Sequence, residues 1–178
     1  FCDGLCAVNI RGRWGYIDST GALVIPCMFD GPRAQPFVGG WAGVNVDSRW
    51  GFVDRHGDWL VKPHYDDVQR FSEGFAPVKL KNKWGVLHVS GRMQLPPMFD
   101  DLSDFNGGMA AASVDGKAGY ISPEGRWIIE PRFDRGSEFV GDLAVVRVGE
   151  RYSYISRFGE TVWTSQPWAS PPSLPVQV

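Results

Sequence analysis

One pattern recurs five times along the chain, and this repeat constrains the fold more than any other feature. A Phe opens each copy, and successive copies start 36, 34, 34 and 34 positions apart, at Phe1, Phe37, Phe71, Phe105 and Phe139. A period of roughly 20–50 residues is typical of stacked arrays, in which each unit packs only against its neighbours. We therefore expect five units over residues 1–164, followed by a proline-rich tail or linker over 165–178. The expected units are 1–36, 37–70, 71–104, 105–138 and 139–164.

Each copy has the pattern of a short β-meander. In its first stretch apolar residues alternate with polar ones, as in Val78-Lys79-Leu80, which is typical of a half-buried strand. A two-residue turn such as Asp115-Gly116 follows, and Asp-Gly favours the tight turns of β-hairpins. A second strand then leads to a turn that ends in a glycine in every copy: Gly21, Gly57, Gly91, Gly125 and Gly159. A third strand completes the unit.

The fold class that we expect is all-β, as an open stacked solenoid of three-stranded units. A closed propeller is the alternative, but its blades usually need four strands and about 40 residues or more. Pro77 lies inside the first strand of the third copy and cannot donate to a β-ladder. We therefore expect this strand to lie at a sheet edge. The residues aligned with Pro77 in the other copies should likewise not donate their backbone N–H to a β-ladder; they are Ala7, Gly43, Ala111 and Val145.

A recurrent Trp-Gly pair carries a resemblance to a known family. The chain reads Arg-Trp-Gly-Tyr-Ile-Asp-Ser-Thr-Gly at 13–21, Arg-Trp-Gly-Phe-Val-Asp-Arg-His-Gly at 49–57 and Phe-Ser-Glu-Gly-Phe-Ala-Pro-Val at 71–78. These segments are similar to the WG-containing repeat, which is found mostly in bacterial proteins. The pairs are Trp14-Gly15, Trp50-Gly51 and Trp84-Gly85, and the last two copies have Ala118-Gly119 and Tyr152-Ser153 instead. The resemblance implies a β-repeat scaffold used for binding, without a general set of catalytic residues.

The Trp-Gly pair favours a structural role, because a glycine beside Trp lets a neighbouring ring or backbone approach closely. A row of rings that stacks on sugars is the alternative. Two columns of charged residues also recur. Basic residues stand before the Trp position (Arg13, Arg49, Lys83, Lys117, Arg151), and acidic residues stand near the end of the unit (Asp30, Asp66, Asp100, Asp134). We expect these columns to pair between units or to be solvated.

Composition argues against polyanionic partners. Eighteen Lys and Arg and twenty Asp and Glu give a net charge of −2, whereas nucleic acids and anionic membranes attract a basic excess. No stretch approaches the roughly 18 apolar residues that a membrane span needs. We expect neither a nucleic-acid partner nor membrane insertion. Because the chain lacks an initiator Met and starts at the first residue of a repeat, we expect a fragment or a processed product.

No pattern points to a reactive site. Cys2, Cys6 and Cys27 fall in three unrelated repeat columns, which predicts free thiols, no metal site and a reducing compartment such as the cytoplasm. None of the three histidines stands in a recognisable arrangement with a nucleophile and a carboxylate. We therefore expect no enzymatic activity and no cofactor.

Functional residues should be those that break the repeat. Trp59 and Trp127 share a column with Leu23, Met93 and Thr161, so the fold does not require a large ring there. Partly exposed Trp is favoured at binding hot spots, although packing against the neighbouring unit is the alternative. The candidate binding residues are Trp59, Trp127, His64 and Arg132, the last two in a variable slot after proline.

The function that we expect is a non-enzymatic protein-binding or scaffold module of a bacterial protein. An immunity- or inhibitor-type protein that blocks a partner is a specific version of it. The alternative is glycan or cell-wall binding through exposed Trp rings.

The recurrent glycine at the end of the second turn gives a first testable prediction. Gly57→Val should lower stability by several kcal/mol, because a β-branched residue is strained at positive φ. Thermal unfolding measures the effect, and an unchanged melting temperature would show that the turn assignment is wrong.

Overall fold

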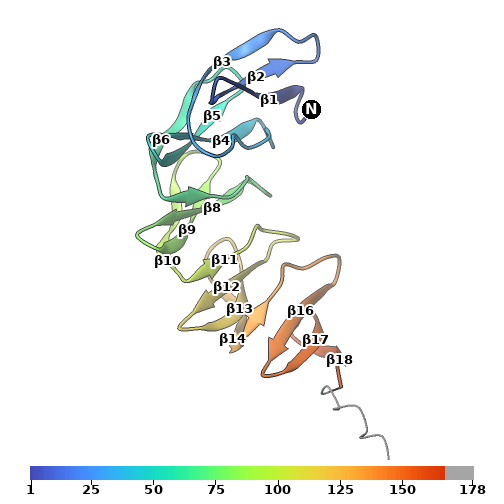
Figure 1. Ribbon diagram of the computed structural model, residues 1–178. Coiled ribbons are helices and arrows are strands. Elements are labelled where there is room, and N and C mark those ends of the chain that lie inside the picture. The colour runs from blue at the N-terminus through green and yellow to red at the C-terminus, as the bar shows by residue number, and fades with distance from the viewer. Residues whose placement is uncertain (167–178) are drawn as a thin grey trace, which may run out of the picture.

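The computed structural model describes residues 1–166, and all regular structure in them is β (Figure 1). The first two units form β1 (Leu5–Ile10), β2 (Arg13–Asp18), β3 (Leu23–Phe29), β4 (Trp41–Val46), β5 (Arg49–Asp54), β6 (Trp59–Tyr65) and β7 (Asp67–Val68). The next two form β8 (Phe75–Leu80), β9 (Lys83–His88), β10 (Met93–Phe99), β11 (Asp101–Leu102), β12 (Ala110–Val114), β13 (Lys117–Ile121), β14 (Trp127–Phe133) and β15 (Arg135–Gly136). The last forms β16 (Leu143–Val148), β17 (Arg151–Ser156) and β18 (Thr161–Thr164). Most of the predicted proline-rich tail, from residue 167 on, lies outside the described residues.

The strands form five separate antiparallel sheets that follow one another along an open array (Figure 1). Each sheet contains a three-stranded meander, as predicted, in the order β1-β2-β3, β4-β5-β6, β8-β9-β10, β12-β13-β14 or β16-β17-β18. The sheets do not close into a ring. The predicted all-β open repeat array is therefore confirmed.

A short fourth strand, which the sequence pattern does not predict, is added to each of the last three sheets. β7, β11 and β15 pair with β8, β12 and β16, so the end of one sequence unit joins the sheet of the next. The predicted edge position of the Pro77 strand is therefore wrong, because β7 covers it. The aligned N–H groups of Ala111 and Val145 donate to the hydroxyls of Ser103 and Ser137, at 2.9 and 3.0 Å, and not to the backbone.

Both kinds of turn have the expected backbone geometry. The two central residues of the first four hairpin turns all have φ between 50° and 84°, which matches the strand twist. The glycine that ends the second turn is left-handed in all five copies, and Gly57 has φ 89°.

The glycine of each Trp-Gly pair permits a close backbone approach. The third strand bulges toward it, and a Cβ at Gly85 would lie 2.6 Å from the carbonyl oxygen of Leu95 and 2.8 Å from the nitrogen of Pro97. In the fifth copy Ser153 stands at this position, and it pairs with Thr164 in a register without that bulge. The glycine thus sets the path of the third strand.

The hydrophobic core lies between successive sheets and not within any one of them. The Phe that opens each unit is at most 4% exposed from the second unit on: Phe37, Phe71, Phe105 and Phe139. Three of these rings pack on an aromatic ring of the preceding unit at 4.7–4.8 Å, as Phe37 does on Tyr16 and Phe139 on Tyr120. The hydroxyls of Tyr16 and Tyr120 donate to the carbonyls of Gln35 and Ser137, at 2.7 and 2.9 Å. These contacts hold the segment between two units against the earlier sheet.

Gly85→Ala should destabilise the chain by about 1–3 kcal/mol, because the added methyl group overlaps the backbone of β10. Denaturant unfolding measures the loss. Gly74→Ala is the matched control, since it places a methyl group where nothing lies within 4 Å and adds only the strain of its φ of 86°. A loss at Gly85 no larger than that at Gly74 would contradict the packing argument.

Alkaline pH should destabilise the array through its buried tyrosines. Burial raises the pKa of Tyr16 and Tyr120 above the ordinary 10.0, so the folded state binds the phenolic proton more tightly than the unfolded state. Their contribution is complete below about pH 10 and is lost as the pH rises above it. In Tyr16→Phe/Tyr120→Phe the fall in unfolding free energy above that pH should be shallower.

Tyr152→Phe is the control for this pH dependence, because Tyr152 is 52% exposed. It should leave the slope unchanged. A double variant with the slope of the parent would contradict the assignment.

Candidate binding surface

The two tryptophans predicted to bind a partner both pack against the preceding unit. Trp59 begins β6 and meets Phe29 edge to face with ring centroids 6.0 Å apart. Trp127 begins β14 and meets Phe99 in the same way at 6.1 Å. Both rings are half-buried, so each has an exposed part.

His64 and Arg132 lie near the ends of the same two strands and are exposed. His64 lies over the neighbouring Tyr65 with ring centroids 3.8 Å apart. Arg132 donates from Nη2 to the carbonyl of Gly159 in the next unit, at 2.7 Å. The four candidates are divided between the second and fourth sheets, with the β7–β10 sheet between them. The structure does not gather them into one cluster, and their binding role stays a prediction.

The repeated Trp row is not open to a ligand. Trp50 and Trp84 are 6% and 8% exposed, and the indole of Trp14 donates to the carbonyl of Gly31 at 3.2 Å. A cation covers the ring in two copies: the Arg33 guanidinium lies 5.9 Å from the Trp50 ring, and the Lys79 ammonium 5.6 Å from that of Trp84. These rings pack against the segments that connect the units.

The acidic and basic columns pair within a unit, and the carboxylate also reaches the next unit. Arg49 pairs with Asp66, Lys83 with Asp100, and Lys117 with Asp134. The hydrogen bond from Lys117 to Asp134 and its counterpart from Lys83 to Asp100 lower the pKa of both carboxyls.

The second oxygen of such an aspartate accepts a backbone N–H from the next hairpin turn. Lys81 and Gly149 donate in this way to Asp66 and Asp134, both at 2.6 Å. The expected pairing of the two columns between units is therefore wrong: the ion pairs lie within a unit, and only the aspartates link successive units.

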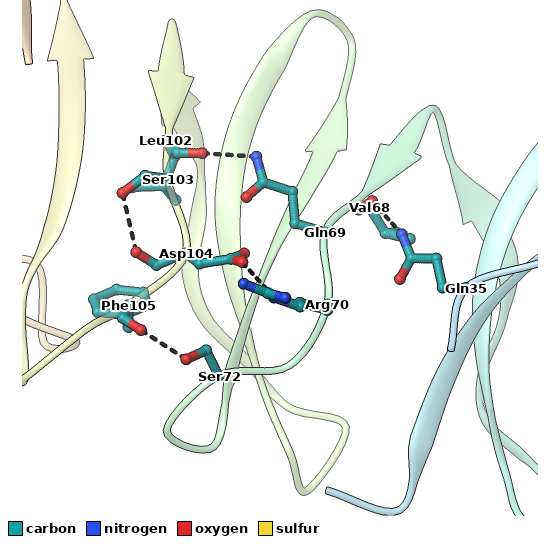
Figure 2. Close-up of polar contacts among 9 residues, drawn as sticks. All are labelled: Gln35, Val68, Gln69, Arg70, Ser72, Leu102, Ser103, Asp104 and Phe105. Carbon is teal, nitrogen blue, oxygen red and sulfur yellow. Dashed lines mark hydrogen bonds and ion pairs between the residues drawn. The ribbon is translucent and has the colours of Figure 1, made fainter. Parts of the chain in front are cut away.

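Connecting segments join the successive units, and the first three of them lie side by side and hydrogen-bond to one another (Figure 2). We call this surface the connecting ladder; it comprises residues 30–37, 66–72, 100–106 and 134–140. Gln35 donates to the carbonyl of Val68 at 2.9 Å, and Gln69 donates to that of Leu102 at 3.0 Å. Figure 2 also shows the Ser72 hydroxyl donating to the carbonyl of Phe105 at 2.7 Å.

An ion pair on this surface joins Arg70 to Asp104, with 2.9 Å between Nε and Oδ2 (Figure 2). The ladder positions that differ from unit to unit carry charges of both signs. Asp67, Asp101 and Arg135 share one column, and Arg70, Asp104 and Glu138 share another. The surface is thus polar and different at each unit.

A hollow of about 690 Å³ interrupts the ladder between its last two segments. Its lining includes Asp101, Ser103, Asp104, Ala118, Arg135 and Glu138. Sequence reasoning missed this site, although its signal was present: Ala118 replaces the Trp of the first three units.

No cluster of three or more His, Cys, Asp or Glu residues that could hold a metal ion occurs within residues 1–166. Cys2, Cys6 and Cys27 are free, as predicted. The described part of the chain includes no helix able to span a membrane.

Solved structures similar to this chain show the fold alone, because their identities are low. A structure of Hsv2 from Kluyveromyces lactis with its complete loop 6CD is 10% identical, with a TM-score of 0.57 over 90% of this chain and 59% of that chain. A eukaryotic initiation factor is 11% identical, with a TM-score of 0.58 over 89% of this chain and 50% of that chain. The chain therefore spans only half to about 60% of these structures. They are β-propeller-like, whereas the five sheets here stay open.

A search of curated proteins finds no match. The model of the WG containing repeat matches four times, at residues 14–50, 50–84, 84–117 and 119–152. Repeated β-units of this kind are typical of non-catalytic binding or scaffold modules. Because the matches cover most of the chain and coincide with the stacked sheets, the chain belongs to the WG containing repeat family.

Proposed function

We propose that this chain is a non-enzymatic module that binds another protein through the connecting ladder. The observation that carries the proposal is the mixed charge of the ladder, which changes from unit to unit, while the rings of Trp50 and Trp84 and the Phe that opens each unit from the second on are buried. Complementary charges select a protein partner and steer its approach. An inhibitor- or immunity-type protein that blocks its partner would use such a surface.

Two features make the ladder a better partner surface than the third strands. Its first three segments are joined to one another, because Gln35, Gln69 and Arg70 each bond to the segment that follows. It also contains the 690 Å³ hollow, within the usual size range of ligand pockets. The third strands carry Trp59 and Trp127, whose rings are partly used in packing.

Glycan binding has less support. Stacking on a saccharide needs an accessible ring face. The regularly spaced Trp50 and Trp84 rings are almost fully buried, and Trp59 and Trp127 are half-buried against Phe rings. Free saccharides in the experiment below test this alternative directly.

The test is affinity capture from a lysate of the source organism, with three baits. They are the parent chain, the ladder variant Asp101→Lys/Arg135→Glu, and the third-strand variant Lys62→Glu/Glu130→Lys. All four residues are exposed, and each variant exchanges one charge of each sign, so the net charge is unchanged. We expect the parent and the third-strand variant to retain one partner in near-stoichiometric amount, and the ladder variant to lose it.

Other outcomes would overturn the proposal. Loss of the partner in the third-strand variant alone would place the surface at Trp59, Trp127, His64 and Arg132, as the sequence predicted. Release of the captured material by free saccharide would favour glycan binding. Equal capture by all three baits would exclude the ladder.

A further inference from the structure

The hollow in the connecting ladder lies where the repeat lacks a side chain. In the first three units a Trp stands at this position: Trp14 donates to the carbonyl of Gly31 in the connecting segment, and Trp50 and Trp84 are buried in core clusters that include Val68 and Leu102 of their own units. Ala118 takes that position in the fourth unit, and Ser113 takes the position of Lys79, whose ammonium covers the Trp84 ring. The fourth unit therefore lacks both the ring and the cation above it.

The next segment does not fill this space. Gln35 and Gln69 span the gap to the following segment in the first two intervals, but Ser103 occupies the same column in the third. The Ser103 hydroxyl bonds locally, to the carbonyl of Asp104 at 3.0 Å and the N–H of Ala111 at 2.9 Å. A space over Ala111, Ala112 and Ala118 is left, open to solvent between two segments.

The lining of the hollow has an excess of hydrogen-bond acceptors. Four carboxylates (Asp101, Asp104, Asp134, Glu138) and two guanidinium groups (Arg70, Arg135) line it. Asp104 pairs with Arg70 through Oδ2 only; its Oδ1 is buried and has no hydrogen-bond partner among residues 1–166. The charge of Asp104 is therefore only partly paired, and a cation in the hollow lowers the cost of burying it.

We propose that this hollow binds an arginine side chain presented by a partner polypeptide. A guanidinium group is planar, as the missing indole is, and it carries five donors in a fixed fork. It can lie over the alanines of the floor and face the carboxylates of Asp101, Asp104 and Glu138. A lysine ammonium has the charge but neither the flat shape nor the fork. The inference rests on the proposed function in one respect, that a partner polypeptide supplies the arginine.

The test uses N-acetyl-arginine amide as the probe and backbone ¹H–¹⁵N NMR as the readout. We expect saturable shifts confined to residues 101–104, 111–113 and 134–138. N-acetyl-lysine amide should bind at least about fivefold more weakly, because it cannot form the bidentate bonds. N-acetyl-tryptophan amide tests whether the hollow accepts any flat ring, and tighter binding of it than of the arginine probe would overturn the proposal.

Two variants locate the site. Ala118→Trp restores the residue of the first three units and fills the hollow, so the arginine-induced shifts should disappear. Asp104→Asn keeps the side-chain size and removes the charge, so binding should weaken by about tenfold or more. The spectra themselves report whether each variant is folded, and Asp104→Asn decides the question if Ala118→Trp does not fold. Shifts that persist unchanged in folded variants, or no shift with the parent, would overturn the proposal.

The outcome for the hollow is distinguishable from the outcome for the proposed function. Binding of the arginine probe without a captured protein would leave the arginine site standing and reject only its polypeptide source. A captured protein with no response to the arginine probe would reject the arginine site alone.

Discussion

The structure depends on the burial of one Phe per unit against the sheet of the preceding unit. A three-stranded meander of this size has too little core of its own, so its apolar face must be covered by a neighbour. Phe37, Phe71, Phe105 and Phe139 supply that cover and are almost fully buried. Each Phe lies at or near the end of a connecting segment, so its burial also holds that segment against the earlier sheet. The contacts that pack the core therefore also fix the course of the connecting ladder.

The connecting ladder is consequently held in place by contacts with the sheets and between its segments. The hydroxyls of Tyr16 and Tyr120 hold its backbone from below, and side chains such as Gln35 and Gln69 join one segment to the next. Because the framework is satisfied by these repeated contacts, the exposed ladder positions are free to differ. The array can thus keep one fold while it presents a different charge pattern at each unit. The hollow has a different origin, since Ala118 lies in β13 and replaces the Trp of the first three units.

The repeat pattern predicted the fold in considerable detail. Alternating residues identified the strands, and the hairpin turns and the glycine after the second strand had the predicted positive φ. The fourth strands were missed, because two-residue pairs such as Asp67-Val68 have no periodicity from which to recognise a strand. The same omission led to the wrong edge position for the Pro77 strand. The candidate site was less predictable: Trp59 and Trp127 break the repeat, but the sequence does not show that each meets a Phe of the preceding unit.

The sequence by itself determined the number of units, their strands and turns, and the family. These properties follow from local periodicity and from residue types in aligned columns, which a single chain displays completely. Only the tertiary structure decided which columns face one another. It showed that an aspartate such as Asp134 contacts both Lys117 of its own unit and the backbone of Gly149 in the hairpin turn of the next unit. It also showed that Ala118, Ser103 and Asp104, which belong to separate columns, surround one space. That conjunction depends on the stacking distance and rotation between sheets, which burial of the inter-unit core determines and no single column encodes.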